Sequence, residues 1–297
     1  MVKTCILFHV LILVLFLTVQ ASSINDKTSS SKFYKRFLGS KRGDTVEGLE
    51  QVRKYLSKYG YIGPSMDGRY QRSLHTFNDS NVFDHDLKKG IKKFQLFFKL
   101  NVSGILDKET LSIMVKPRCK FPDFVNGTPI KHGMKLVWNP INSSYYAFLQ
   151  TKWPKSKYKL TWLAHSTTRS DAIEPLSLAF KSWQDDSVFN FKRASSFSSA
   201  DVKITFYSGD PFEEKELANS YPPPSGKLDF NADIPWAIQS QPHAMDIESV
   251  AVHEIGHILG LAHSEDIDAI MWPYLDWGVV KRVLNFDDIL GITMLYN

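Results

Sequence analysis

Cysteine is nearly absent from this chain, which has only Cys5 and Cys119 among its 297 residues. After the first 20 residues, no apolar run is long enough to cross a membrane, which takes about 20 residues in a helix. Basic residues form no single long block of the kind typical of nucleic-acid-binding chains. Hydrophobic residues make up 43% of the chain and charged residues 23%, which excludes a mainly disordered or fibrous protein.

The first 21 residues have the composition of a secretory signal peptide. Lys3 precedes an apolar run from Cys5 to Val19, and Ala21, followed by small residues, offers a cleavage site. The run is short for a membrane span, so a cleaved signal over residues 1–21 is favoured over a signal anchor. We therefore expect a protein without a stable membrane anchor, secreted to the extracellular space or to the cell wall or matrix.

Removal of that signal leaves Cys119 as a lone thiol in an oxidising compartment. An internal disulfide is then impossible, and the alternatives are pairing with another chain, metal ligation or a buried, inert thiol. Four Asn-x-Ser/Thr sequons agree with secretion and are candidate glycosylation sites: Asn78, Asn101, Asn126 and Asn142.

Charge divides the chain into two unlike halves. Residues 1–143 carry 23 Lys and Arg against 11 Asp and Glu, a net charge of +12. Residues 144–297 carry 13 against 20, a net charge of −7. This asymmetry is typical of two domains that dock on each other and fits nucleic-acid binding less well. We expect a monomer that binds no nucleic acid.

Apolar spacing predicts helices in the first half of the chain. It is helical over residues 46–59, 87–98 and 109–115, which predicts a three-helix unit over 44–116. Residues 117–143 are rich in proline and glycine turns and contain two sequons, so we expect an exposed linker there.

The second half has a different pattern. Strands are predicted at residues 159–165, 201–207 and 217–221, and helices at 173–183, 247–261 and 287–296. Asp171 is the expected cap of the first of these helices. Strands combined with one long central helix indicate an α+β fold.

The motif with the most chemical content is His253-Glu-Ile-Gly-His257, followed by Gly260 and His263. His253 and His257 are four residues apart and share one helix face, and Gly260 permits a turn that brings His263 to them. Three imidazoles leave the fourth position of tetrahedral zinc open to water, whose pKa the metal lowers to ~7. Glu254 would accept that proton and pass it to a leaving amine. The alternative, a buried histidine helix without metal, does not explain the spacing.

These residues, with Met271 downstream and a final segment from Phe286 to Tyr296, resemble the matrixins, which are secreted zinc metalloproteases of the metzincin clan. The resemblance covers essentially the whole chain and implies a twisted sheet with a long active-site helix, preceded by a three-helix propeptide. Met271 would match the Met-turn, the hydrophobic floor beneath the zinc, although alone it would be an ordinary core residue. The order of segments, without a propeller domain, is similar to that of plant matrixins.

Residues 117–123, Pro-Arg-Cys-Lys-Phe-Pro-Asp, resemble the cysteine switch of that family. A Cys119 thiolate on zinc would exclude water and keep the enzyme latent, which explains the lone thiol. Lys120 stands where the family usually has glycine, and we expect it to weaken latency. The resemblance implies a signal over residues 1–21, a propeptide over 22–144 and a catalytic domain over 145–297.

The resemblance also implies a second, structural zinc with calcium nearby, but the residues for them are missing. The His-x-Asp segment is deleted after Asp210, and the remaining ligand positions hold Asn219, Asp229, Asn231 and Ile234. Asn219 is a poor zinc ligand and Ile234 is none. We expect one catalytic zinc, no structural zinc and weak or no calcium binding, with a compensating local rearrangement as the alternative.

Together these features predict a latent zinc endopeptidase, inhibited by its own propeptide, that cleaves extracellular proteins or peptides. The substrate would add to a sheet edge at Leu217 and Ala218 and place an apolar side chain in a pocket walled by Pro273 and Tyr274. The rival hypothesis is a matrixin-like binding protein that has lost catalysis; the missing structural site favours it, and the intact histidines with Glu254 argue against it. Residues 91–107 also resemble a peptidoglycan-binding-like fold, but a shared fold does not imply glycan binding.

Overall fold

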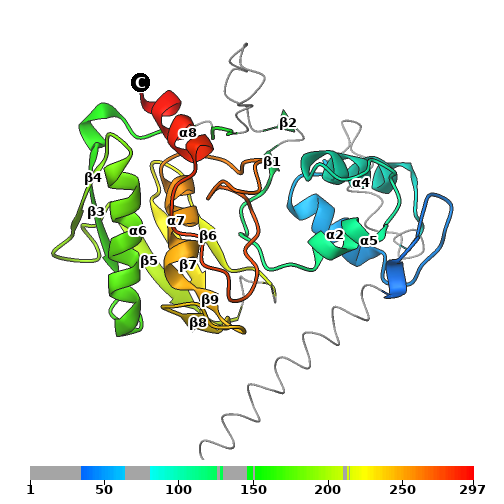
Figure 1. The fold of residues 1–297 in the computed structure, drawn as a ribbon, viewed down its shortest axis with the longest axis horizontal. Helices are drawn as coiled ribbons and strands as arrows, with labels where there is room; N and C mark the ends of the chain where they lie inside the picture. The colour runs from blue at the N-terminus through cyan, green and yellow to red at the C-terminus, as the bar shows by residue number, and fades with distance from the viewer. Residues whose placement is uncertain are drawn as a thin grey trace, which may run out of the picture.

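The computed structural model describes residues 35–63, 81–125, 128–129, 146–149, 151–209, 213 and 215–297. The predicted signal peptide and three sequons, at Asn78, Asn126 and Asn142, lie outside the described residues, and Asn101 is exposed. No helix in the described part of the chain combines the length and apolar composition needed to cross a bilayer. Figure 1 shows a small helical unit beside a larger unit in which helices pack against a sheet.

The helical unit contains the three predicted helices. They are α2 (Glu50–Lys58), α4 (His85–Phe97) and α5 (Lys108–Met114). The carboxylates of Asp84 and Asp107 cap α4 and α5 by accepting the first free backbone N–H groups, at 2.8 and 2.9 Å. Apolar residues at helical spacing close a core that includes Val52, Leu56, Leu87, Ile91 and Phe94. The predicted three helices are therefore confirmed.

The larger unit contains a five-stranded sheet in the order β4-β3-β5-β7-β6. Its strands are β3 (Lys159–Ala164), β4 (Asn190–Arg193), β5 (Val202–Tyr207), β6 (Ala218–Ser220) and β7 (Lys227–Asn231). All neighbours are parallel except β6, which is antiparallel to β7 and forms an edge of the sheet. Sequence pattern indicated β3, β5 and β6 but not β4 or β7. The strand β4 is mostly exposed and β7 is mostly buried, so neither alternates along its length.

Three helices accompany this sheet: α6 (Ile173–Asp185), α7 (Ile247–Ile258) and α8 (Phe286–Tyr296). The helices α6 and α7 pack against each other, and every residue of α7 is buried (Figure 1). Shorter elements are β1 (Phe124–Val125), β2 (Thr128–Pro129), η1 (Lys155–Lys157), η2 (Ser170–Ala172), β8 (Trp236–Ala237) and β9 (Met245–Asp246). The α+β class expected from the sequence is confirmed, with a fully buried helix at its centre.

The predicted cap at Asp171 is wrong. The helix α6 begins after the 3₁₀ turn η2, its N-cap residue is Ala172, and no side chain caps it. The Asp171 carboxylate instead forms an ion pair with Arg169 at 2.6 Å. The extra turn moves the helix start beyond the reach of Asp171, a shift that a capping rule applied to sequence does not detect.

The predicted exposed linker is also wrong in its first part. Within the segment Pro117–Phe124, only Lys120 and Pro122 are partly exposed and the other residues are buried. The segment passes between the two units, and its polar groups find partners on both sides. Proline, glycine turns and sequons indicated exposure, but proline also suits an extended segment, and the charges of this segment can be buried because they are paired. Residues 130–143 lie outside the described part of the chain.

Candidate metal centre and active site

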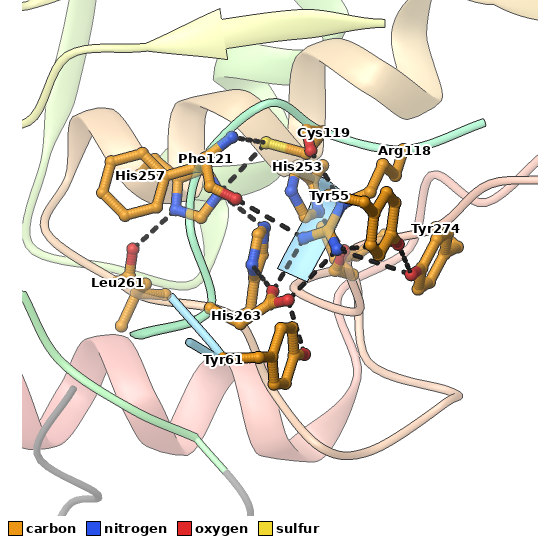
Figure 2. Close-up of polar contacts among 12 residues, drawn as sticks. Tyr55, Tyr61, Arg118, Cys119, Phe121, His253, His257, Leu261, His263 and Tyr274 are labelled. Atoms are coloured by element: carbon orange, nitrogen blue, oxygen red, sulfur yellow. Dashed lines mark hydrogen bonds and ion pairs between the residues drawn. The ribbon is translucent and has the colours of Figure 1, made fainter. Parts of the chain in front are cut away.

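Four potential metal ligands converge in the cleft between the two units (Figure 2). The helix α7 presents His253 and His257 on one face, and the chain then turns at Gly260, where φ is +99°. A Cβ atom at Gly260 would approach the Thr151 carbonyl oxygen to 2.8 Å, so the turn requires glycine. The turn returns His263, and one ligand atom from each histidine and from Cys119 all lie within 4.8 Å of one another.

The hydrogen bonds of the three imidazoles suit metal binding. The Nδ1 atoms of His253 and His257 lie 2.7 and 2.8 Å from the carbonyl oxygens of Ile270 and Leu261. Each Nδ1 therefore donates its proton outward, which leaves a lone pair on Nε2 facing the centre. The Nε2 atom of His253 is buried without any hydrogen-bond partner, as expected of an atom that holds a metal ion.

Burial keeps these imidazoles neutral. It lowers the pKa of His253 to about 3 and that of His257 well below the usual value. The third ring, His263, is oriented through Nδ1 by the Asp123 carboxylate at 2.6 Å. Three neutral nitrogen donors around one point form a donor set that fits zinc.

The fourth ligand position is filled by the segment 117–123, which we call the switch segment. The Cys119 sulfur lies 3.5 Å from His257 Nε2 and accepts the Phe121 N–H at 3.3 Å. Burial raises the pKa of the Cys119 thiol, so a metal ion is needed to hold it as a thiolate. The predicted residues His253, His257, His263 and Cys119 are thus brought together, and zinc fits them as a three-nitrogen, one-sulfur site.

Glu254 lies beside this cluster and is fully buried. One carboxylate oxygen accepts a hydrogen bond from the Ser220 hydroxyl, and the other, Oε1, has no partner. Burial raises the pKa of Glu254 to about 7, a value suited to a group that exchanges protons near neutral pH. Ser220 is a site residue that the sequence did not indicate, because it lies in β6, 34 positions before Glu254.

Met271, the predicted floor of the site, is buried against α7. A Cβ atom added at Gly256 would approach the Met271 sulfur to 2.2 Å, so glycine permits this close packing below the histidines. The backbone N–H of Met271 donates to the Asp288 carboxylate at 3.0 Å, which ties the turn to α8. The predicted place of Met271 beneath the ligand helix agrees with these contacts.

The switch segment occupies the sheet edge at which a substrate was expected. Its backbone bonds to one wall of the cleft at Lys215, Leu217 and Ala218, with N–O distances of 2.9–3.0 Å. On the other wall, the Cys119 N–H donates to the Pro273 carbonyl at 3.0 Å. A pocket beside the metal cluster is lined by the predicted substrate contacts Leu217, Pro273 and Tyr274, together with His253 and Glu254.

A buried ion pair holds the switch segment in this bent form. Both Arg118 terminal nitrogens donate to Asp123, at 2.8 and 3.1 Å, and the guanidinium stacks 3.5 Å from the centre of the Tyr59 ring. Burial alone would raise the pKa of Asp123, but Arg118 and the His263 hydrogen bond lower it to about 2. The Asp123 carboxylate therefore stays charged and links the switch segment to the metal ligand His263.

Lys120 was expected to weaken latency because it replaces a glycine, but it imposes no backbone strain on the switch segment. Lys99 is the one non-glycine residue with positive φ in the described part of the chain, so Lys120 adopts ordinary backbone geometry. Its N–H donates to the Ala218 carbonyl at 2.9 Å, and its Nζ lies 3.8 Å from the Glu216 carboxylate. The side chain fits without glycine because it extends along the cleft wall toward an acidic partner.

The residues at the expected structural metal positions have protein partners. The Asp229 carboxylate pairs with Lys227 at 2.6 Å and accepts the Thr205 hydroxyl, and the Asn231 side chain donates to the Glu216 carbonyl at 2.8 Å. Asn219 lies opposite Asp229 in the ladder of β6 and β7, and Ile234 is a core residue. These contacts agree with the loss of the second zinc, which stays a prediction.

The metal content of the purified full-length protein tests that prediction. We expect one zinc per chain by elemental analysis, because the histidine and cysteine cluster is the only group with metal-binding geometry in the described residues. A His263→Ala variant, which removes one ligand of that cluster, should lower the zinc content well below one. Two tightly held zinc ions per chain would show that a structural site persists.

Comparison with known proteins agrees with both units. Residues 151–297 match the matrixin family model and residues 45–114 match the model of a putative peptidoglycan binding domain. Metalloendoproteinase 2-MMP of Arabidopsis thaliana is 36% identical over 289 residues, covering 89% of this chain and 74% of the relative. Metalloendoproteinase 1 of Glycine max is 33% identical over 86% of this chain and 83% of the relative. Matrix metalloproteinase-16 of Homo sapiens is 30% identical over 85% of this chain and 42% of the relative.

Two features thus agree. The likeness extends over 74% and 83% of the two plant relatives, and the cleft between the two units holds four groups that could bind a metal ion. The helical unit corresponds to the propeptide domain that such proteases carry. The chain belongs to the matrixin family of zinc metalloendopeptidases.

Proposed function

We propose that this chain is a secreted zinc endopeptidase made as a latent zymogen that cleaves peptide bonds of extracellular proteins. The observation that carries the proposal is the convergence of three neutral imidazoles and one thiol beside a buried carboxylate, Glu254, with one unpartnered oxygen. When bound there, zinc supplies a Lewis acid that polarises a carbonyl and acidifies a water molecule. Glu254 accepts the proton from that water and delivers it to the leaving amine.

We assign the signal peptide to residues 1–21, the propeptide to 22–144 and the catalytic domain to 145–297. Two separate hydrophobic cores support this division. The core around α7 draws its residues only from positions 153–296, whereas the helical core draws on positions 37–124 plus Tyr274. The catalytic domain therefore has an apolar core of its own, independent of the propeptide.

Latency follows from what the switch segment occupies. Cys119 fills the ligand position that water needs, and the backbone of Arg118 and Lys120 pairs with the strand edge that would bind a substrate. Release of the segment frees the Leu217 N–H and the Ala218 and Pro273 carbonyl oxygens for an extended peptide. One substrate side chain would then enter the pocket beside Tyr274.

Removal of metal tests this proposal. The full-length chain, processed by limited proteolysis between the two cores, is expected to hydrolyse an unfolded protein or a peptide mixture. A zinc chelator should abolish the hydrolysis and added zinc should restore it, because the three histidines supply no chemistry without the ion. Hydrolysis that persists in a protein shown to be free of metal would contradict the proposal. A processed, zinc-loaded protein that cleaves no peptide would favour the binding-protein hypothesis.

A further inference from the structure

Glu216 is a buried carboxylate at the cleft whose charged partners, within the described part of the chain, all belong to the propeptide. Only 3% of its side chain is exposed, and it pairs with Lys58 of α2 and, at 3.8 Å, with Lys120 of the switch segment. The Tyr59 hydroxyl donates to it at 3.1 Å. From its own domain it accepts the backbone N–H of Glu213 at 3.0 Å.

The other acidic groups that pair with propeptide lysines are much more exposed. The side chain of Glu213, which pairs with Lys54 and Lys58, is 49% exposed, and that of Asp276, which pairs with Lys116, is 52% exposed. Exposed pairs of this kind contribute little at physiological salt, because water and ions screen them. Glu216 differs in that the propeptide covers it and supplies two ammonium groups to it.

The position of Glu216 connects it to the reacting centre. It directly precedes Leu217, whose N–H bonds to the switch segment, and its backbone lies opposite Arg118 in a parallel bridge. Lys120 is adjacent in sequence to Cys119, which faces the metal ligands, and the Lys120 ammonium extends toward Glu216. A side chain one residue away from a group at the metal therefore has the length to meet this carboxylate.

We propose that Glu216 selects substrates that carry lysine or arginine next to the scissile bond. When the propeptide leaves, Glu216 loses Lys58, Tyr59 and Lys120 and keeps, among the described residues, the Glu213 N–H as the donor to its carboxylate. A substrate peptide bound at the same strand edge can place an ammonium or guanidinium group beside the Glu216 carboxylate. The propeptide lysines occupy that place in the zymogen. A pair that is partly covered by the bound peptide is stronger than a fully exposed one. This inference rests on the endopeptidase function proposed above and refines its substrate class.

Peptide hydrolysis tests the proposal. The full-length chain is processed with a serine protease that is then irreversibly inhibited, and is offered peptides that differ only in Lys, Gln or Glu at each position flanking one cleavage site. We expect kcat/KM to be about tenfold higher for Lys than for Gln at one position adjacent to the scissile bond, and lowest for Glu. The preference should weaken as salt concentration rises.

Two variants separate Glu216 from a general effect of charge. In Glu216→Gln, the ratio of kcat/KM for the Lys and Gln peptides should fall to about one. The matched control Asp276→Asn removes one negative charge from the other wall of the cleft and should keep the ratio. An unchanged ratio in Glu216→Gln, or an equal loss in both variants, would overturn the proposal.

Peptide binding gives a readout independent of catalysis. Fluorescence anisotropy in the Glu254→Gln background measures Kd for the same peptides without turnover. We expect the Lys peptide to bind about tenfold more tightly than the Gln peptide, which is the ratio expected for kcat/KM. If the wild-type protein cleaves peptides but the Lys and Gln peptides bind with equal Kd, the Glu216 inference fails while the endopeptidase function stands. If it cleaves nothing, the proposed function fails, and the Kd comparison still decides whether Glu216 recognises a basic side chain.

Discussion

Replacement of Glu254 by glutamine is expected to lower peptide hydrolysis by at least the ~10²–10⁴-fold typical of losing general acid–base catalysis. Glutamine has nearly the same shape, but its amide cannot accept and pass on a proton as a carboxylate does. Zinc should remain bound, because none of the three histidines changes. The measurement is kcat/KM of the processed chain, with zinc content determined on the same sample.

The matched control is Glu248→Gln, six residues earlier on the same helix. Glu248 pairs with Arg282 at 3.0 Å and belongs to no part of the metal cluster, so its variant should retain most of the activity. Near-normal turnover by a zinc-loaded Glu254→Gln protein would show that Glu254 is not the base.

Cys119→Ser is expected to release activity from the unprocessed chain, partly at low ionic strength and more fully as salt rises. A serine hydroxyl is a poorer zinc ligand than a thiolate, so water gains access to the metal. The backbone bonds of the switch segment and the ion pairs of the propeptide remain. Those pairs include Lys54 and Lys58 with Glu213, at 3.1 Å each, and Lys116 with Asp276 at 2.8 Å. The charge asymmetry of the two halves thus acts partly through contact pairs, and salt screens exposed pairs.

Activity of the unprocessed variant across a salt series, relative to the same sample after processing, measures this effect. Adding Lys58→Gln to Cys119→Ser should raise the activity at low salt toward its value at high salt, because Lys58 contacts both Glu213 and Glu216. Full activity at every salt concentration would mean that the ion pairs do not hold the propeptide. Full latency at every salt concentration would mean that Cys119 is not the switch.

The sequence alone determined the features that depend on residues close together in the chain. The four-residue spacing of His253 and His257 sets two imidazoles on one helix face, and Gly260 permits the turn that returns His263. Apolar periodicity likewise determined α2 and α4, and the local carboxylate of Asp107 determined the start of α5. These features follow from helix geometry, which is the same wherever such a segment lies in a fold.

The tertiary structure decided which residues far apart in the sequence come into contact. Pattern rules predicted the switch segment to be exposed from its proline and the turns and sequons that follow, because a local window does not show the Tyr59 ring and His263 that cover Arg118 and Asp123. Ser220 reaches Glu254, and Lys58 reaches Glu216, across long stretches of chain. A buried charge is stable only when a partner is brought to it, and which residue becomes that partner depends on how the two units dock.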